Sequence, residues 1–279
     1  MISPFDIIKE TLSESIPLNF LDILPNKWEQ IGDVLVVKLD KNLDNYKDEI
    51  GKIYCDILKC KTVLNDIGGI SGVYRKPNLE LIYGSNDTVT IHKENGIRYK
   101  LDVRKIMFSS GNMDERIRMA NISNGSETVV DLFSGIGYFT LPLAVYSVPK
   151  KIFACEINPV AYGFLCENII LNDVSKIVIP LLGNNKEVAP KNIADRVIMG
   201  YFDDNYDFLP VAFNCLKNFC GFIHYHRLCP EEKIPKFSFD EVKMVAENFN
   251  RKASLISYNK IKSYAPGISH VVLDVYIGG

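Results

Sequence analysis

The chain has 279 residues, of which 47% are hydrophobic and 24% charged, an ordinary balance for a globular protein of one large or two smaller domains. A formal net charge of -2 excludes a global attraction to polyanions, so any contact with nucleic acid must come from a local basic patch. The seven cysteines include no CxxC pair and do not share zinc spacing with the four histidines. No apolar stretch approaches the roughly 20 residues of a membrane span, and Asp6 lies where a signal peptide would be apolar. We therefore expect a cytoplasmic protein with reduced thiols and no metal site.

The first part of the chain, residues 1–105, predicts a small α+β module that could contact RNA. A helix and a loop are expected within Pro4–Ile23, a strand over Trp28–Leu39 and an amphipathic helix over Asp44–Cys60. Short strands should follow over Thr62–Leu64, Gly68–Arg75, Leu79–Ile82, Thr88–Glu94 and Ile97–Val103. Asn95-Gly96 between the last two is a strong hairpin signal.

The rest of the chain, residues 106–279, predicts an α/β domain. After a short polar helix over Gly111–Ala120, apolar strands alternate with helices such as Gly137–Tyr146 and Pro159–Asn172. The seven strands are expected over Thr128–Asp131, Lys151–Glu156, Ile177–Leu182, Ala194–Met199, Gly221–Tyr225, Lys252–Ile261 and Val271–Ile277. The last two have no room for a helix between them and should pair antiparallel through Ser263–Gly267. This order predicts the Rossmann-like fold of class I S-adenosylmethionine-dependent methyltransferases.

A glycine loop after the first of these strands gives the sharpest local signal, Asp131-Leu132-Phe133-Ser134-Gly135-Ile136-Gly137-Tyr138-Phe139. Gly135 and Gly137 allow a tight turn and a close approach to a ligand. A dinucleotide site would want a third glycine where this chain has Thr140. The loop, with Phe133 and Gly135, is therefore expected to cradle the amino-acid end of S-adenosylmethionine; the alternative is a plain structural turn.

Two further polar positions end neighbouring strands. Glu156 follows the glycine loop by about 20 residues, where an acid commonly binds a ribose hydroxyl pair. The alternative for Glu156 is a helix-capping acid ahead of Asn158-Pro159. Asn184, in Leu181–Asn185, stands where the adenine amine is often read, although it could also belong to an ordinary turn. All three elements are expected at the carboxyl edge of the sheet, where open α/β folds bind ligands.

Nearly the whole chain resembles the archaeal aminocarboxypropyl transferases of wybutosine synthesis on phenylalanine tRNA. The residues that carry the resemblance are Leu24-Pro25, Trp28-Glu29, Ile31–Leu35, Lys105–Ser109, Glu115–Met119, Asp131–Phe139, Glu156–Pro159, Gly183–Pro190, Val197–Tyr201 and Ile223–His226. The tRNA guanine-N1 methyltransferases are similar to much of the same pattern. The resemblance implies an enzyme that transfers the 3-amino-3-carboxypropyl group of S-adenosylmethionine to the tricyclic demethylwyosine base beside the anticodon of tRNA(Phe), releasing methylthioadenosine.

The same resemblance implies which residues contact S-adenosylmethionine: Ser109, Arg116, Glu156 and the pair Asn184-Asn185. The family usually has Asp where this chain has Asn184, so that contact loses charge assistance. Arg116 and the Ser109 hydroxyl could hold the carboxylate of the methionine part, whereas the alternative for Arg116, and more so for Arg118, is a solvated helix charge.

The end of the fourth strand distinguishes the two reactions. Amine-directed methyltransferases end it with Asn-Pro-Pro or Asp-Pro-Pro, and the guanine-N1 relatives with Asn-Leu-Pro, whereas this chain has Met199-Gly200-Tyr201. A glycine that opens space and the missing acceptor favour aminocarboxypropyl transfer, although Gly200-Tyr201 could also be a simple turn. No general base is evident. His224 and His226 end the fifth strand, one expected to face inward and the other outward, and structural roles are favoured for both.

Contacts with tRNA are expected from two basic sets, although either could be a solvated face. They are Lys93, Arg98, Lys100, Arg104, Lys105, Arg116 and Arg118, and then Lys252, Lys260 and Lys262. Tyr138 and Tyr201 could stack on an extruded base. The main alternative is a tRNA (guanine-N1) methyltransferase. A catalytically silent RNA-binding module is a second alternative, which the intact glycine loop disfavours. A small-molecule methyltransferase is a third, which would not need the N-terminal module.

Overall fold

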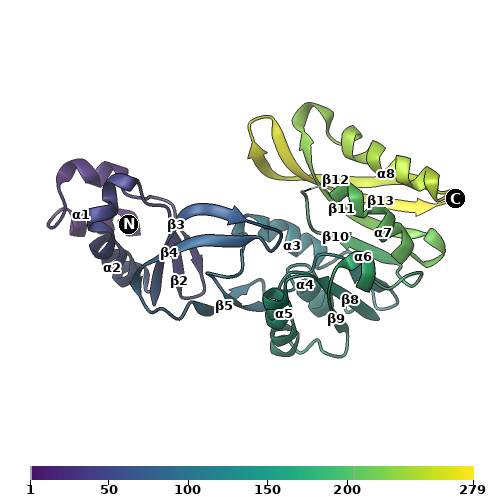
Figure 1. Ribbon diagram of the computed structural model, residues 1–279, viewed down its shortest axis with the longest axis horizontal. Helices are drawn as coiled ribbons and strands as arrows, with labels where there is room; N and C mark the ends of the chain where they lie inside the picture. The colour runs from purple at the N-terminus through teal and green to yellow at the C-terminus, as the bar shows by residue number, and fades with distance from the viewer. Residues whose placement is uncertain (1, 204) are drawn as a thin grey trace. The chain divides into compact units, whose positions relative to one another are not determined.

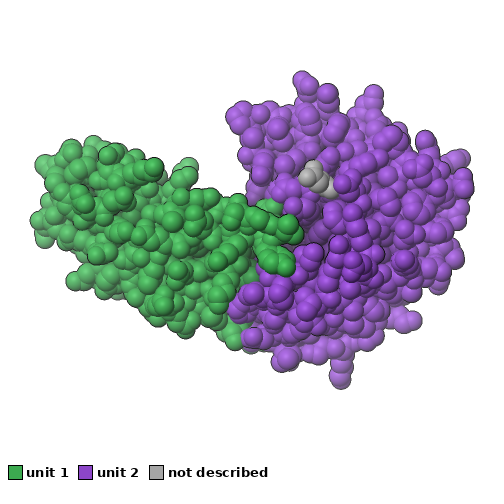
Figure 2. Space-filling model, in the orientation of Figure 1, with its two compact units in different colours: residues 1–110 green, residues 111–279 purple. Residues whose placement is uncertain are grey.

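The computed structural model describes residues 2–203 and 205–279, and the chain divides into two compact units, residues 1–110 and 111–279 (Figures 1 and 2). The boundary expected after residue 105 falls within the last residues of the first unit. None of the described helices has the length and apolar character needed to cross a bilayer.

The first unit combines two helices with a four-stranded sheet and a separate hairpin. A capping box between Ser3 and Asp6, with Pro4 in the first turn, begins helix α1. The elements are α1 (Pro4–Leu12), β1 (Glu29–Ile31), β2 (Val34–Val37), α2 (Lys47–Leu58), β3 (Thr62–Ser71), β4 (Lys76–Gly84), β5 (Val89–Glu94) and β6 (Ile97–Asp102), with 3₁₀ helices over Leu18–Ile23 and Lys41–Tyr46. The larger sheet has the order β1-β2-β3-β4, and β5 pairs only with β6. The α+β character predicted for this part is confirmed.

Two strand predictions in this unit are wrong in detail. The single strand expected over Trp28–Leu39 is a hairpin, because Gly32 adopts a left-handed φ of 58° and reverses the chain between β1 and β2. The strand expected over Gly68–Arg75 is instead the end of β3 followed by a turn. The hairpin predicted at Asn95-Gly96 is confirmed: both residues have positive φ, and β5 and β6 pair antiparallel across them.

The second unit contains a seven-stranded sheet of order β12-β13-β11-β10-β7-β8-β9. Its strands are β7 (Thr128–Asp131), β8 (Lys151–Glu156), β9 (Val178–Leu182), β10 (Arg196–Met199), β11 (Gly221–Pro230), β12 (Lys252–Ala265) and β13 (Ile268–Gly278). Strands β11, β10, β7, β8 and β9 run parallel, whereas β13 is antiparallel to both β11 and β12. The predicted Rossmann-like order with an antiparallel terminal pair is confirmed.

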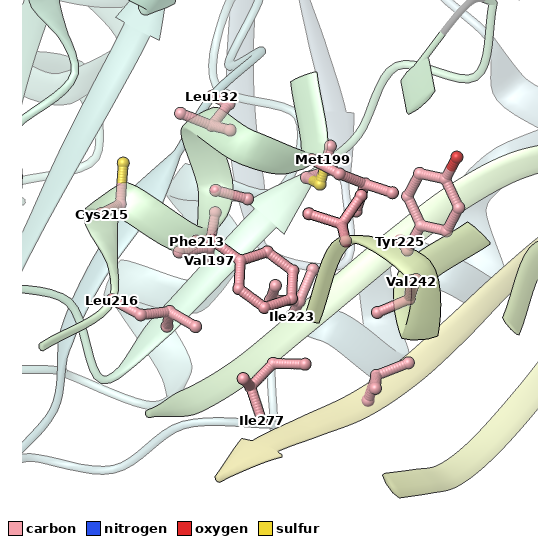
Figure 3. Packing of buried hydrophobic residues seen from close by; sticks show 14 of the residues in the cluster. Leu132, Val197, Met199, Phe213, Cys215, Leu216, Ile223, Tyr225, Val242 and Ile277 are labelled. Carbon is pink, nitrogen blue, oxygen red and sulfur yellow. The ribbon is translucent and has the colours of Figure 1, made fainter. Parts of the chain in front are cut away.

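Helices cover both faces of this sheet. They are α3 (Met113–Met119), α4 (Thr140–Tyr146), α5 (Pro159–Leu171), α6 (Asn185–Val188), α7 (Leu209–Cys215) and α8 (Lys236–Asn248). On the face of α7 and α8, Phe213 lies between Val197 and Ile223 of the sheet in a large apolar cluster (Figure 3). On the other face, Phe139 at the start of α4 packs against a histidine of β11. The strands that end at this edge are therefore packed on both faces by buried side chains.

Candidate functional site

The glycine loop joins the end of β7 to the start of α4. Gly135 and Gly137 have φ values of 57° and 101°, which side-chain-bearing residues rarely adopt. A Cβ on Gly135 would lie 2.5 Å from the ring of Tyr138, and one on Gly137 would lie 2.6 Å from Cγ of Leu141. Both glycines are therefore required by the backbone and by the packing of the loop on itself.

Asp131 locks this loop from inside the protein. Its carboxylate is fully buried and accepts hydrogen bonds from Oγ1 of Thr140 at 2.7 Å and from the backbone N–H of Phe133 at 3.2 Å. Burial raises the pKa of Asp131 to about 6. Thr140, which stands where a dinucleotide loop would have its third glycine, thus supplies a hydroxyl that holds the acid. Asp131 shapes the loop rather than facing a ligand.

Glu156 ends β8 and connects two backbone segments. Its Oε2 accepts from the N–H of Gly135 at 2.8 Å, and its Oε1 accepts from the N–H of Asn158 at 2.7 Å. The N-cap of α5 is Asn158, whose side chain accepts from Val160, so Glu156 precedes the N-cap and contacts it only through the N–H of Asn158. Burial raises the pKa of Glu156. Each carboxylate oxygen retains lone pairs for further donors, so a pair of ribose hydroxyls fits here.

The two asparagines after β9 have different surroundings. Oδ1 of Asn184 caps α6 by accepting from the N–H of Lys186 at 3.1 Å. Asn185 is buried, and its Nδ2 donates to the carbonyl of Leu132 at 2.9 Å, within the glycine loop. Oδ1 of Asn185 has no hydrogen-bond partner among the described residues. A buried acceptor without a partner is costly, so this oxygen suits a ligand donor such as an amine.

Ser109 and Arg116, the residues expected to hold the carboxylate, lie in different units. Ser109 is half-buried near the end of the first unit. Arg116, on α3 of the second unit, is only 3% exposed, so the alternative of a solvated helix charge is wrong for it. The same alternative is wrong for Arg118, which forms ion pairs of 2.7 Å with both Glu115 and Asp274.

At the end of β10 the structure departs from the space that Gly200 was expected to open. A Cβ on Gly200 would lie 2.8 Å from the ring of Phe139, so this ring already fills the space. The next residue, Tyr201, stacks on Phe133 of the glycine loop with ring centroids 5.4 Å apart. The end of β10 is therefore built from aromatic rings that leave no room for a side chain at Gly200.

His224 and His226 lie on the same face of β11, not on opposite faces, because residues two apart in a strand point the same way. Both are buried. His224 is held at both nitrogens, by Asp274 at 2.6 Å from Nδ1 and by Arg196 at 2.7 Å from Nε2. Although burial disfavours the charged form of Asp274, hydrogen bonds from His224, Ser257 and Arg118 keep its pKa well below the usual range. His224 therefore has the structural role that was favoured for it.

The basic sets expected to contact tRNA are only partly available. Lys93 and Arg98 are exposed on the β5–β6 hairpin, and Lys105 is exposed beside Asp102. Arg116 and Arg118 are withdrawn into the second unit, as described above. In the second set, Lys252 and Lys260 are exposed, and Lys260 pairs with Glu231 at 2.6 Å. Among the described residues, no cluster of three or more His, Cys, Asp or Glu is arranged to hold a metal ion.

Comparisons with known proteins cover most of the chain, including parts of both units. Residues 90–255 match the model of the TRM5/TYW2 methyltransferase domain, and residues 8–88 match that of the TYW2 N-terminal domain. A Pyrococcus horikoshii protein named tRNA(Phe) (4-demethylwyosine(37)-C(7)) aminocarboxypropyltransferase is 44% identical over 97% of this chain and 96% of its own length. The tRNA (guanine(37)-N(1))-methyltransferase Trm5b of Pyrococcus abyssi is 36% identical over 93% of this chain and 77% of its own.

Solved structures extend the similarity to the fold. The crystal structure of P. horikoshii TYW2 in complex with MeSAdo superposes with a TM-score of 0.88 at 41% identity, covering 98% of this chain and 99% of that one. The similarity thus includes both units, and the relative was crystallised in complex with MeSAdo.

Proposed function

This chain belongs to the TRM5/TYW2 family, and we propose that it transfers the 3-amino-3-carboxypropyl group of S-adenosylmethionine to the demethylwyosine base at position 37, beside the anticodon of tRNA(Phe), releasing methylthioadenosine. The observation that carries the choice of group is the end of β10. At Met199-Gly200-Tyr201 it has no Asn or Asp acceptor and no proline to hold an amine nucleophile. The reaction is assigned to the cytoplasm.

The residues at the carboxyl edge fit S-adenosylmethionine. Gly135 and Gly137 allow a close approach of the backbone, and Glu156 is assigned to the ribose hydroxyls. Oδ1 of Asn185, which has no partner among the described residues, is assigned to the adenine amine. Phe133, in the glycine loop and stacked on Tyr201, is also assigned to the S-adenosylmethionine site. Arg116 is assigned to the carboxylate, since a buried guanidinium binds an anion strongly. A contact from Ser109 stays a prediction of the family resemblance.

Selection of the transferred group depends on orientation. The sulfonium carries three carbons, and a nucleophile in line with any one of them displaces the rest. A site that binds the methionine carboxylate away from its usual place presents the aminocarboxypropyl carbon to the acceptor instead of the methyl carbon. We assign Arg116, rather than the glycine loop, to binding the methionine carboxylate in this altered position.

The acceptor base is assigned to the aromatic side of the site. Tyr201, already stacked on Phe133, offers a flat surface for an extruded tricyclic base. The exposed Lys93 and Arg98 of the first unit and Lys252 of the second are assigned to tRNA phosphates. The first unit, with its boundary between residues 105 and 110, would therefore hold the tRNA while the second performs the transfer.

The function is tested by supplying the purified protein with tRNA(Phe) that carries the tricyclic precursor, and with S-adenosylmethionine labelled in either the methyl or the carboxyl carbon. Carboxyl label should enter the tRNA while methylthioadenosine is released. Methyl label in the tRNA would instead make the chain a methyltransferase like its guanine-N1 relatives. A Glu156→Gln variant serves as the control that must lose transfer together with ligand binding.

A further inference from the structure

A pair of buried histidines lies beside the end of β10. His226 is on β11, one residue beyond the last pairing of that strand with β10, between Met199 and Tyr225. His270, on β13, is its neighbour: Nδ1 of His226 and Nε2 of His270 are 3.1 Å apart. The two side chains are 0% and 1% exposed. Their other nitrogens, Nε2 of His226 and Nδ1 of His270, have no hydrogen-bond partner among the described residues.

Whichever proton arrangement the pair adopts, it presents one basic nitrogen. A neutral imidazole carries one N–H and one lone pair. If Nε2–H of His270 donates to Nδ1 of His226, the lone pair of His270 Nδ1 is free. If Nδ1–H of His226 donates instead, the free lone pair is on Nε2 of His226. Oε1 of Glu115, 3.9 Å from Nε2 of His226, favours a proton on that nitrogen and hence a free lone pair on His270.

The surroundings keep both rings neutral. Burial lowers the pKa of His226 well below its usual value, and that of His270 to about 4. The charged and titratable groups that face the pair are Glu115 and Arg118 of α3, His224 of β11, Asp274 of β13 and Lys262 of β12. Arg118 and Lys262 oppose a positive charge on the rings, whereas Asp274 favours one. The net result is a proton acceptor that is not already occupied at neutral pH.

Aromatic rings place this pair against the acceptor side of the proposed site. Phe139, which fills the space beside Gly200, lies 5.0 Å from the His226 ring, and Phe202 lies 4.8 Å from the His270 ring. Asn205 fixes the strand ends, since its Nδ2 donates to the carbonyls of Met199 and His226. Its Oδ1 is a third buried atom without a partner among the described residues. A buried polar atom without a partner suits a bound water, and these three atoms belong to residues joined by hydrogen bonds.

The chemistry proposed above requires a proton acceptor. As the ring carbon of the base forms its bond to the aminocarboxypropyl carbon, the carbon–sulfur bond breaks, its electron pair stays on sulfur and the positive charge moves to the base. The base regains its aromatic system when that carbon loses its proton and the electron pair of the C–H bond returns to the ring. Other buried groups are engaged: His224 at both nitrogens, and Asp131 and Glu156 by backbone N–H groups.

We propose that His226 and His270 form a proton relay that, through a bound water, takes up the proton lost by the acceptor carbon and passes it on to solvent. This inference rests on the proposed function. The relay is assigned a water because both imidazoles are buried and pack against the rings of Phe139 and Phe202.

The test uses His270→Gln in the full-length protein. A glutamine amide reaches the position of Nε2 and keeps the hydrogen bond to His226, but it has no basic nitrogen. His226→Gln is the second variant, and Tyr276→Phe, on the same strand as His270 but half-exposed, is the matched control. Single-turnover transfer is measured with precursor tRNA that carries hydrogen or deuterium on the acceptor carbon. Binding of S-adenosylmethionine and thermal unfolding are measured in parallel.

The relay predicts that each glutamine variant still binds S-adenosylmethionine, transfers on the order of 100-fold more slowly and gains a deuterium effect that the wild type lacks. A purely structural role would slow transfer without any deuterium effect, and that result, or wild-type rates in the variants, would overturn the relay. If one variant unfolds, the other decides. If the wild-type protein transfers no aminocarboxypropyl group at all, the proposed function fails, which is distinct from failure of the relay alone.

Discussion

Two stretches of the same sheet edge are built in opposite ways. Where β7 and β8 end, the site consists mainly of backbone: two glycines with positive φ, and N–H groups of Gly135 and Asn158 directed at Glu156. Where β10 and β11 end, it consists of side chains: Phe139, Phe202 and the pair His226–His270. A backbone cradle depends little on side-chain identity, whereas the side-chain cluster depends on each residue that forms it. The predictions below separate these two stretches.

The largest expected effect is an opposite pH dependence of stability. Folding raises the pKa of Asp131 from 3.8 to about 6, so the folded state binds the extra proton and stability falls as pH rises through that window. Folding lowers the pKa of His270 from 6.5 to about 4, so the unfolded state binds the extra proton and stability rises with pH. Each contribution is about 3 kcal/mol.

Substitutions should reveal the two contributions separately. Relative to the wild type, Asp131→Asn should become more stable as pH rises from 4 to 6, and His270→Gln should become less stable over its window from 4 to 6.5. Urea unfolding at several pH values measures both differences. Parallel curves for wild type and either variant would mean that the substituted group does not titrate differently in the folded state.

The next effect concerns ligand binding. Glu156→Ala removes the acceptor of two backbone N–H groups and the proposed ribose contact, so S-adenosylmethionine should bind on the order of 100-fold more weakly, about 2.7 kcal/mol. Calorimetric titration measures this. Glu187→Gln, on the nearby α6, should bind as the wild type does. Unchanged affinity in Glu156→Ala would remove Glu156 from the cofactor site.

A pair of glycines tests the backbone cradle. Gly137→Ala places a Cβ 2.6 Å from Leu141 at a φ of 101°, and should cost roughly 2 kcal/mol of unfolding free energy. Gly163→Ala, in the middle of α5 with nothing within 4 Å, should stabilise by roughly 0.5–1 kcal/mol. Equal effects of the two substitutions in denaturant unfolding would contradict a strained loop at Gly137.

The side-chain stretch predicts a smaller effect, confined to transfer. Gly200→Ala presses a methyl group against Phe139 and should displace Tyr201 and Phe202, so transfer should slow on the order of tenfold while affinity for S-adenosylmethionine stays unchanged. Transfer and binding are measured on the same preparation. Weakened binding with normal transfer would place Gly200 in the cofactor site instead.

A part of the site could be predicted from the sequence where its residues lie close together in the chain, and could not where they lie far apart. The glycine loop and Glu156 were predictable because a strand, a turn and a helix follow one another within a short segment. The histidine pair was not, since His226 and His270 are 44 positions apart and meet only through the register of β11 on β13. The hairpin at Gly32-Asp33 was predictable, since Gly-Asp between two strand-like runs is a turn signal, and it was missed.

The sequence also could not show which of two neighbouring polar residues offers a hydrogen-bond acceptor to the ligand. Asn184 and Asn185 were both candidates, and only burial shows that Asn185 carries the unpartnered oxygen while Asn184 caps a helix. Similarly, Arg116 could be read as exposed or buried until α3 was placed. Such distinctions depend on packing from elements far away in the chain.

Asn184 provides the smallest expected effect. Asp and Asn are equally good N-caps, so Asn184→Asp should leave the unfolding free energy within about 0.5 kcal/mol of the wild type. If the residue also contacts the adenine amine, the added charge should tighten binding of S-adenosylmethionine a few-fold, about 1 kcal/mol. Asn184→Ala should lose the cap, about 1 kcal/mol of stability. Unchanged affinity in both variants, with the loss of stability in the second alone, would reduce Asn184 to its capping role and leave Asn185 as the acceptor for adenine.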